Sequence, residues 1–271
     1  MDALRQIEGW PVEWATAGVT TADRVLAVHG DAERVQGWAS VTKPVTALAA
    51  LVAVEEGIVD LEEPAGPPGS TIRHLLAHAS GLGPEPGPPL IEPERRRVYS
   101  NYGFEVLADV IAERSEMPFA EYLRQAALDP LGLSAELVGS AGSGLEGPLR
   151  DVLAIGREYL APRAVAPETL DEATTVQFPG LIGVLPSFGR MDPNDWGLGV
   201  EIRDGKAPHW TGATNSPRTF GHFGATGTFL WVDPDAGLAC AALTDRPFGD
   251  WAKEAWPRLS DAVLASAQSS A

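Results

Sequence analysis

The sequence predicts an α+β fold, in which helices flank one antiparallel sheet built from both ends of the chain. Strand-like segments lie near the two ends of the 271 residues, whereas the middle contains helical segments and Pro-rich loops. The turns between the late segments are short enough for β-hairpins. We therefore expect a single domain over residues 1–271, with an α/β part at about 1–60 and 178–271 and a reduced, mainly helical part at about 61–177.

The N-terminal part contains a predicted β-hairpin followed by a buried helix. Residues 17–21 and 24–30 have the composition of strands and are separated by a short break. From Val41 to Val54, apolar residues occur on nearly every side, which is typical of a helix that is buried all round. Proline is tolerated only in the first helical turn, so Pro44 predicts that this helix begins near Ser40.

The middle part is predicted to consist of helices and loops. Residues 70–81 and 102–114 carry apolar residues at helical spacing, and another helix at 118–133 opens with a proline. The Pro-rich stretch 81–97 is expected to be an irregular loop, and the Gly- and Ser-rich stretch 139–147 a flexible link.

The last third of the chain returns to strands and ends in a helix at 250–267. The predicted strands are residues 196–202, 207–212, 219–223, 227–232 and 238–244. With the N-terminal hairpin, these strands complete the expected sheet.

Composition excludes several classes of protein. The formal charge of 20 − 37 = −17 argues against non-specific binding to nucleic acid or to an anionic membrane. A single cysteine, Cys240, excludes an internal disulfide and a Cys-rich zinc site. No signal peptide and no apolar run of membrane-spanning length is visible, so we expect a cytoplasmic protein. The oligomeric state is left open.

Ser40 and Lys43 are the first candidate catalytic residues. Residues three apart share one helix face, so Lys43 can reach the Ser40 hydroxyl. Burial removes the solvation of an ammonium group and lowers its pKa, which turns lysine into a usable base. The helix N-terminus also offers unpaired N–H groups to a developing oxyanion.

Two further motifs accompany this pair, namely Tyr99-Ser100-Asn101 and His222-Phe223-Gly224. The composition gives about 0.15 chance matches to Ser-x-x-Lys and about 0.04 to Tyr-x-Asn. The third motif is weak by itself, and its value lies in its position on a late predicted strand.

In this order the three motifs resemble those of the serine β-lactamase and penicillin-binding-protein superfamily, particularly class C β-lactamases, related DD-peptidases and family VIII esterases. Longer blocks of the sequence share the resemblance, so that it covers most of the chain. They include residues 38–64, 71–82, 118–133 and 220–238. The resemblance implies a β-lactamase/transpeptidase-like fold.

The resemblance also implies a role for each motif residue. Ser40 would be the acylated nucleophile and Lys43 its base partner. Tyr99 would move a proton between the nucleophile and the leaving group, and Asn101 would hold Lys43 and the substrate acyl group by hydrogen bonds. No cofactor and no metal is implied.

In the same resemblance, His222 and Gly224 would line the site, and the backbone N–H of Ala225 would form the oxyanion hole with that of Ser40. Lactam-active members usually carry Lys-Thr-Gly as the third motif, and its cation holds the substrate carboxylate. A histidine that is mostly neutral near pH 7 replaces this cation here, which favours esters.

We therefore expect a serine hydrolase that forms an acyl-enzyme with a small carboxylic ester, with an amide or lactam as the second choice. One alternative is a penicillin-binding-type peptidase, a β-lactamase or an acyltransferase. Another is a non-catalytic binding protein that retains the motifs.

Structural interpretations compete with the catalytic ones. His74 and His78 have a spacing that can bind zinc, but no third ligand is evident and packing is favoured. His222 could be the base of a Ser-His-Asp triad, and Ser40 could be only a helix cap. Residues 95–97, all arginine, are expected to form a solvated loop, although they lie close enough to Tyr99 to touch an acidic substrate.

Overall fold

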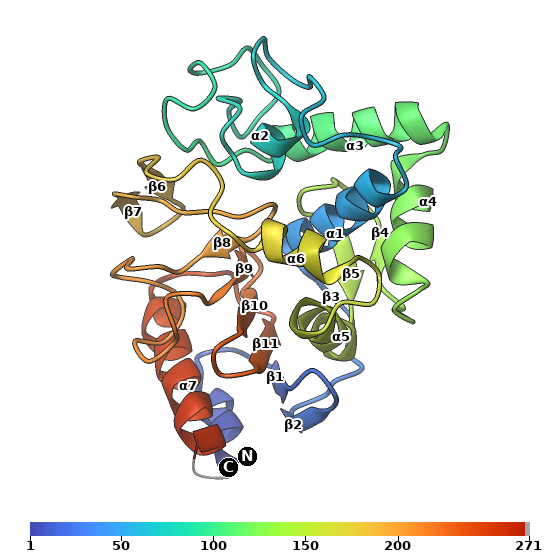
Figure 1. Cartoon of the computed structure of the whole chain (residues 1–271). Coiled ribbons are helices and arrows are strands. Elements are labelled where there is room, and N and C mark those ends of the chain that lie inside the picture. The colour runs from blue at the N-terminus through green and yellow to red at the C-terminus, as the bar shows by residue number, and fades with distance from the viewer. Residues whose placement is uncertain (269–271) are drawn as a thin grey trace.

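A computed structural model describes residues 1–268 and contains a six-stranded antiparallel sheet formed by both ends of the chain (Figure 1). The order of the strands is β2-β1-β11-β10-β9-β8. The strands are β1 (Ala15–Thr20), β2 (Val25–His29), β8 (Glu201–Ile202), β9 (Phe220–Gly224), β10 (Thr228–Asp233) and β11 (Leu238–Thr244). The first strand pairs with the last, with Val19 opposite Cys240. The predicted α+β class and antiparallel sheet are confirmed.

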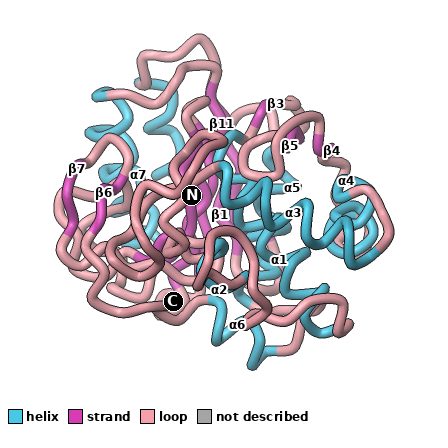
Figure 2. The backbone as a smooth tube through the Cα atoms, turned by 90° about the horizontal axis from the view of Figure 1, so that it is seen from above, coloured by secondary structure: helices cyan, strands magenta, loops and turns pink. Residues whose placement is uncertain are grey.

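A separate hydrophobic core covers each face of the sheet. Successive side chains of a strand point to opposite faces, so Leu230 joins one core and Trp231 the other. Helices α1 (Thr42–Glu55) and α5 (Leu149–Leu160) pack on the first face. Helix α7 (Asp250–Gln268) and the 3₁₀ segment η1 (Asp2–Gly9) lie side by side on the second. Figure 2 shows α1, α3, α4 and α5 on one side of the strands and α7 on the other.

Helix α1 is the centre of the helical region and is buried along nearly its whole length. This follows from its sequence, which offers no polar face to the solvent. The helices around it are α2 (Ile72–Leu76), α3 (Tyr102–Ser115), α4 (Phe119–Leu123), the π-helical continuation η3 (Arg124–Leu128) and α6 (Pro167–Ala173). The predicted helix at 102–114 is confirmed. No helix among residues 1–268 is both long and apolar enough to cross a bilayer.

The prediction of a flexible link at 139–147 is wrong. Strand β5 (Leu145–Gly147) lies in this stretch, between β3 (Gln36–Gly37) and β4 (Glu136–Leu137). Thr42 Oγ1 accepts a hydrogen bond from the Leu145 N–H, and Thr46 Oγ1 donates one to the Ala141 carbonyl. The glycines permit tight turns against α1. Composition alone does not distinguish glycines of tight turns from glycines of a flexible link.

Two predicted strands also differ from the structure. Residues 207–212 form no strand, because the side chains of His209 and Trp210 turn inward to bind a buried carboxylate on β8. The segment 196–202 is shortened to β8 itself. A hairpin that the sequence analysis did not anticipate, β6 (Gly183–Leu185) with β7 (Gly189–Met191), precedes it.

Candidate active site

Ser40 lies in a short 3₁₀ turn, η2 (Ala39–Val41), that leads directly into α1. The residue before it, Ala39, has a φ of +47°, a conformation that non-glycine residues seldom adopt outside constrained sites. The cap of α1 is Val41, without a side-chain cap hydrogen bond. The Ser40 hydroxyl is therefore not occupied as a helix cap.

Two side chains contact the Ser40 hydroxyl. Lys43 Nζ lies 3.3 Å from Ser40 Oγ, and the Tyr99 hydroxyl donates a hydrogen bond to the same oxygen at 2.8 Å. The first contact follows from the spacing of three along one helix face. The second joins residues 59 positions apart and depends on how the loop before α3 packs against η2.

Lys43 is buried, and burial lowers its pKa from 10.5 to about 7, although Glu105 acts in the opposite direction. Its Nζ donates to Asn101 Oδ1 at 2.7 Å and to the Gly142 carbonyl at 2.8 Å. A neutral amine has two N–H groups and one lone pair. With both N–H groups directed at these two oxygens, the lone pair is left for the Ser40 hydroxyl.

Tyr99 remains a neutral phenol near pH 7, because burial raises its pKa well above the ordinary value and outweighs the opposing hydrogen bond with Ser40. Its ring packs against that of His78, with centroids 4.6 Å apart. Lys43 Nζ lies 4.7 Å from the Tyr99 ring centroid. The phenol hydroxyl can therefore pass on a proton, but it is a poor primary base.

His222 is also neutral in the folded protein, since burial and the nearby charge of Lys43 lower its pKa to about 3. Its Nδ1 lies 2.7 Å from the Phe223 carbonyl oxygen, which can only accept, so Nδ1 carries the proton. The unprotonated Nε2 then faces the Tyr99 hydroxyl at 3.4 Å. A Ser-His-Asp triad requires a carboxylate on Nδ1, and a backbone carbonyl takes that place here.

The end of β9 runs unusually close to the turn that carries Ser40. A Cβ atom on Gly224 would lie 2.4 Å from the Trp38 carbonyl oxygen and 3.0 Å from Ala39 Cβ. Only glycine fits at this distance. The close approach brings Ala225 and Ser40 to the same cavity, as an oxyanion hole formed by their N–H groups would require.

A cavity of about 250 Å³ opens over the Ser40 hydroxyl. Five of the seven predicted site residues line it, namely Ser40, Tyr99, Asn101, His222 and Ala225. The remaining lining residues are mostly apolar, and they are Leu185, Pro186, Ser187, Trp196, Glu201, Phe223 and Phe248. Lys43 and Gly224 are not among the lining residues. Lys43 contacts Ser40, which lines the cavity, and Gly224 directly precedes Ala225, which also lines it.

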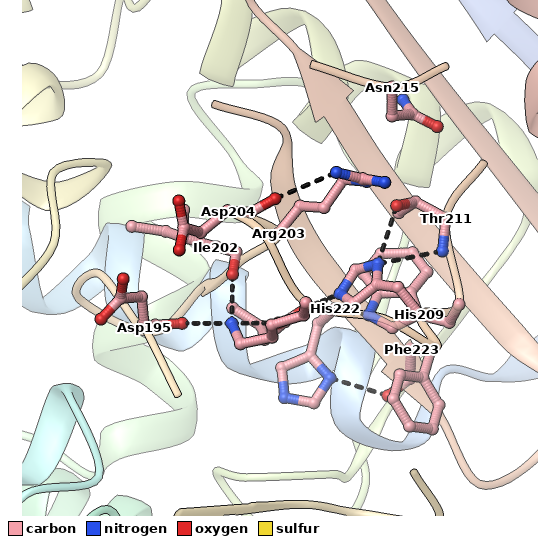
Figure 3. A network of polar contacts seen from close by, with 12 residues as sticks. Asp195, Ile202, Arg203, Asp204, His209, Thr211, Asn215, His222 and Phe223 are labelled. Atoms are coloured by element: carbon pink, nitrogen blue, oxygen red, sulfur yellow. Dashed lines mark hydrogen bonds and ion pairs between the residues drawn. The ribbon is translucent and has the colours of Figure 1, made fainter. Parts of the chain in front are cut away.

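Behind the third motif lies a buried network of charges, which Figure 3 shows next to His222 and Phe223. Glu201 accepts hydrogen bonds from Lys206 Nζ at 2.6 Å and from Trp210 Nε1 at 2.8 Å, and it meets His209 Nε2 at 2.8 Å. Both Glu201 oxygens are thus occupied within the protein. The network fixes β8 and the loop that follows it, and it leaves no free carboxylate for a substrate.

The two histidines with zinc-like spacing have separate protein partners. His74 Nδ1 contacts Thr71 in a capping box, and its Nε2 lies 2.9 Å from Glu94 Oε1. His78 Nδ1 accepts a hydrogen bond from the Ser100 N–H. Within residues 1–268, no group of three or more His, Cys, Asp or Glu side chains is arranged to hold a metal ion.

Sequence reasoning missed several residues that complete the site. Gly142 binds Lys43 through its carbonyl oxygen, and His78 supports the Tyr99 ring. Glu201 and Phe248 line the cavity. None of them lies in a motif, and a backbone carbonyl leaves no signal in residue type. The one signal in the sequence is the charge of Glu201, which stands in the otherwise apolar segment 196–202 and indicates a buried polar role.

A family model described as Beta-lactamase matches residues 12–264, nearly the whole chain. The chain belongs to this beta-lactamase family. A crystal structure of a beta-lactamase from Mycobacterium bovis is 54% identical, with a TM-score of 0.97, and the match covers 98% of this chain and 99% of that one. The resemblance and the β-lactamase/transpeptidase-like fold are thereby confirmed, and the chain is a member of the serine beta-lactamase-like hydrolases.

Two further proteins are similar to the chain, one in fold and one in part of its sequence. EstCE1, described as a hydrolase with promiscuous acyltransferase activity, is 17% identical with a TM-score of 0.81, over 97% of this chain and 98% of that one. Penicillin-binding protein 4* of Bacillus subtilis is 30% identical, but the match covers only 35% of this chain and 29% of that protein. The match therefore spans less than a third of this curated relative.

Proposed function

We propose that this protein hydrolyses small carboxylic esters through an acyl-enzyme on Ser40. The observation that carries the proposal is the position of the Ser40 hydroxyl, 3.3 Å from a buried lysine amine and 2.8 Å from a phenol hydroxyl. A serine nucleophile needs an adjacent base and a route for its proton, and this arrangement supplies both.

In the acylation step, neutral Lys43 takes the proton of Ser40 as Oγ attacks the ester carbonyl carbon. The carbonyl oxygen becomes an oxyanion, and the backbone N–H groups of Ser40 and Ala225 stabilise it. The bond to the leaving oxygen then breaks, and that oxygen receives a proton through the Tyr99 hydroxyl. In the second step, water attacks the acyl group and restores Ser40.

The preference for esters rests on His222. Because its pKa is lowered to about 3, this residue carries no charge near pH 7 and offers no cation to a substrate carboxylate beside the third motif. The apolar side chains of Leu185, Phe223 and Phe248 at the cavity suit a short uncharged acyl group.

The test is intact-protein mass after brief exposure to an activated ester, with Ser40→Ala as control. We expect an acyl adduct on the wild-type chain that disappears with time and is absent from the variant. A folded wild-type protein that forms no adduct would overturn the proposal and favour a binding role.

Hydrolysis of β-lactams is the second candidate, supported by 54% identity over nearly the full length of a structure described as a beta-lactamase. A parallel exposure to a cephalosporin separates the two candidates. Rapid turnover of the lactam with weak ester hydrolysis would favour the second, and a long-lived lactam adduct would favour a penicillin-binding type.

A further inference from the structure

A second hollow, a groove of about 570 Å³, adjoins the catalytic cavity and shares Tyr99 and Pro186 with it. One wall of the groove is the segment 96–99, and the other is hairpin β6–β7 with Ile182 before it. The groove therefore reaches the hydroxyl-bearing residue that faces Ser40, and its lining does not include the apolar Phe223 and Phe248 of the catalytic cavity.

The two walls are held together by Arg97, which contradicts the expectation that all of residues 95–97 form a solvated loop. The Arg97 N–H donates to the Ile182 carbonyl at 2.8 Å, and its buried guanidinium donates to the carbonyls of Ala77 and Asn194. The same guanidinium also donates to the carbonyls of Gln177 and Phe178, so four of its five N–H donors meet backbone oxygens. The groove is thus a built feature of the fold.

The lining of the groove combines apolar surface with positive charge. Ile182 and Val184 are exposed, Val184 at 59%, and they supply the apolar part of the lining. Arg96 and Arg190 also line it. Within the described residues Arg96 forms no hydrogen bond or ion pair, and the Arg190 guanidinium has one polar partner, the exposed Asp192 at 3.2 Å.

These cations are notable in a chain whose formal charge is −17. The overall charge repels an anionic ligand, so two arginines at one groove provide local attraction that the rest of the surface lacks. Planar guanidinium groups match a carboxylate in geometry as well as in charge.

We propose that this groove binds the leaving group of the substrate, and that it selects alcohols that carry a carboxylate. The inference rests on the proposed ester hydrolysis. The leaving oxygen must lie beside Tyr99 to receive its proton, and the groove opens at Tyr99. Ser40 Oγ first forms its bond to the carbonyl carbon, and the carbon–oxygen bond to the alcohol then breaks. The leaving oxygen takes a proton through Tyr99, and the carboxylated alcohol departs along the groove.

The test compares two esters with the same acyl group, phenyl butyrate and the butyrate ester of 3-hydroxybenzoate. A carboxylate in the meta position changes the leaving ability of the phenol little. The rates of hydroxide-catalysed hydrolysis of the two esters correct for the small difference that is left. We expect kcat/KM of the wild-type enzyme to favour the carboxylated ester by roughly fivefold at low salt, and added NaCl to reduce this ratio.

Arg96→Gln and Arg190→Gln should each move the ratio of the two kcat/KM values toward one. Arg95→Gln is the matched control, because Arg95 is an exposed neighbour outside the groove that pairs with Glu92, and it should keep the wild-type ratio. Hydrolysis of both esters without a preference, or an equal loss of preference in all three variants, would overturn the groove proposal and leave ester hydrolysis standing.

Binding of 3-hydroxybenzoate and of phenol, followed by NMR, gives a readout that needs no turnover. If neither ester is hydrolysed but 3-hydroxybenzoate binds more tightly than phenol, and Arg96→Gln removes the difference, the groove is supported and the proposed hydrolysis fails. If the two compounds bind equally to the wild-type protein, the groove proposal fails whatever the activity.

Discussion

At the scale of single residues, Lys43 and Tyr99 have different properties although both contact Ser40 Oγ. Burial lowers the pKa of Lys43 to about 7, so that a large share is neutral at physiological pH. Burial raises the pKa of Tyr99, so that the phenol keeps its proton. An effective base has a pKa near the working pH, which supports the proposed roles of Lys43 in proton abstraction and of Tyr99 in proton relay.

The pH dependence of ester hydrolysis tests this division of roles. Only neutral Lys43 acts as a base, so kcat/KM should fall as the pH drops below about 7. Glu105 favours the ammonium form, and Glu105→Gln should lower the Lys43 pKa further and move the acidic limb to lower pH. Glu113→Gln, an exposed change on the same helix, is the control. A shift to higher pH, or an equal shift in both variants, would contradict the assignment.

Tyr99→Phe removes the hydroxyl and keeps the ring that packs on His78. We expect kcat for the ester to fall by about 10²–10⁴-fold, the usual contribution of a proton-transfer group, with little change in the melting temperature. Steady-state kinetics and thermal unfolding measure the two effects. A decrease in kcat of less than tenfold would exclude Tyr99 from the proton route.

At the scale of elements, three pieces of chain meet at the start of α1. The end of β9 approaches η2 closely at Gly224, and the segment 139–147 turns back so that the Gly142 carbonyl reaches Lys43. Neither approach is a property of a single element. The first approach requires a glycine at 224, because a Cβ atom there would collide with the Trp38 carbonyl oxygen, and the second depends on Gly144, where the turn leaves no room for a Cβ atom.

Gly144→Ala tests the segment 139–147. A Cβ atom on Gly144 would lie 2.4 Å from the Gly139 carbonyl carbon and 2.5 Å from the Ser140 nitrogen, so the turn must shift. We expect a loss of stability of about 1–3 kcal/mol, as for other overpacked sites, together with reduced kcat as Gly142 moves from Lys43. Chemical denaturation and ester kinetics measure both. Gly87→Ala, where the added Cβ meets nothing within 4 Å, should match the wild type.

At the scale of the whole molecule, the site lies where the two hydrophobic cores meet beside the sheet. Trp38 and Val41, next to Ser40, belong to the core on the α1 side. Phe223 belongs to the core on the α7 side, and Tyr99 packs against that core. Ser40 and the residues that surround it are therefore supported from two directions, which restricts their movement.

The buried network around Glu201 should make the free energy of unfolding depend on pH in the acidic range. Burial alone raises the pKa of Glu201, but the charges of His209 and Lys206 outweigh it and lower the pKa from 4.5 to about 2. A carboxylate with a lowered pKa stabilises the folded state above the unfolded value, so its contribution should be lost as the pH falls from 4.5 toward 2.

Glu201→Gln tests this coupling. At pH 7 it should lower the free energy of unfolding by about 3–5 kcal/mol, because it leaves the buried Lys206 without a counter-charge. It should also flatten the pH dependence between 4.5 and 2. Urea denaturation across this range measures both effects, with the exposed Glu254→Gln as control. A variant that parallels the wild type throughout would show that the network carries little stability.

The sequence by itself determined the features that depend on local geometry. Residues 41–54 are apolar on nearly every side of a helix, which dictates that this helix is buried. The spacing of three residues at its start places Lys43 near Ser40. Strand composition and short turns likewise specified β9, β10 and β11. Tyr99 and Asn101 were identified because Tyr-x-Asn is rare by chance in this composition, and His222 because of its position on a late predicted strand.

Only the tertiary structure decided the electrostatic state of the site. The neutral form of His222 depends on burial and on the nearby Lys43, and its tautomer depends on the Phe223 carbonyl. The orientation of Lys43 depends on Asn101 and Gly142, which lie far along the chain. The burial of Arg97 and the groove that it braces have the same origin. A pKa and a cavity are set by all the atoms that packing brings near a group, and the order of residues along the chain does not reveal those neighbours.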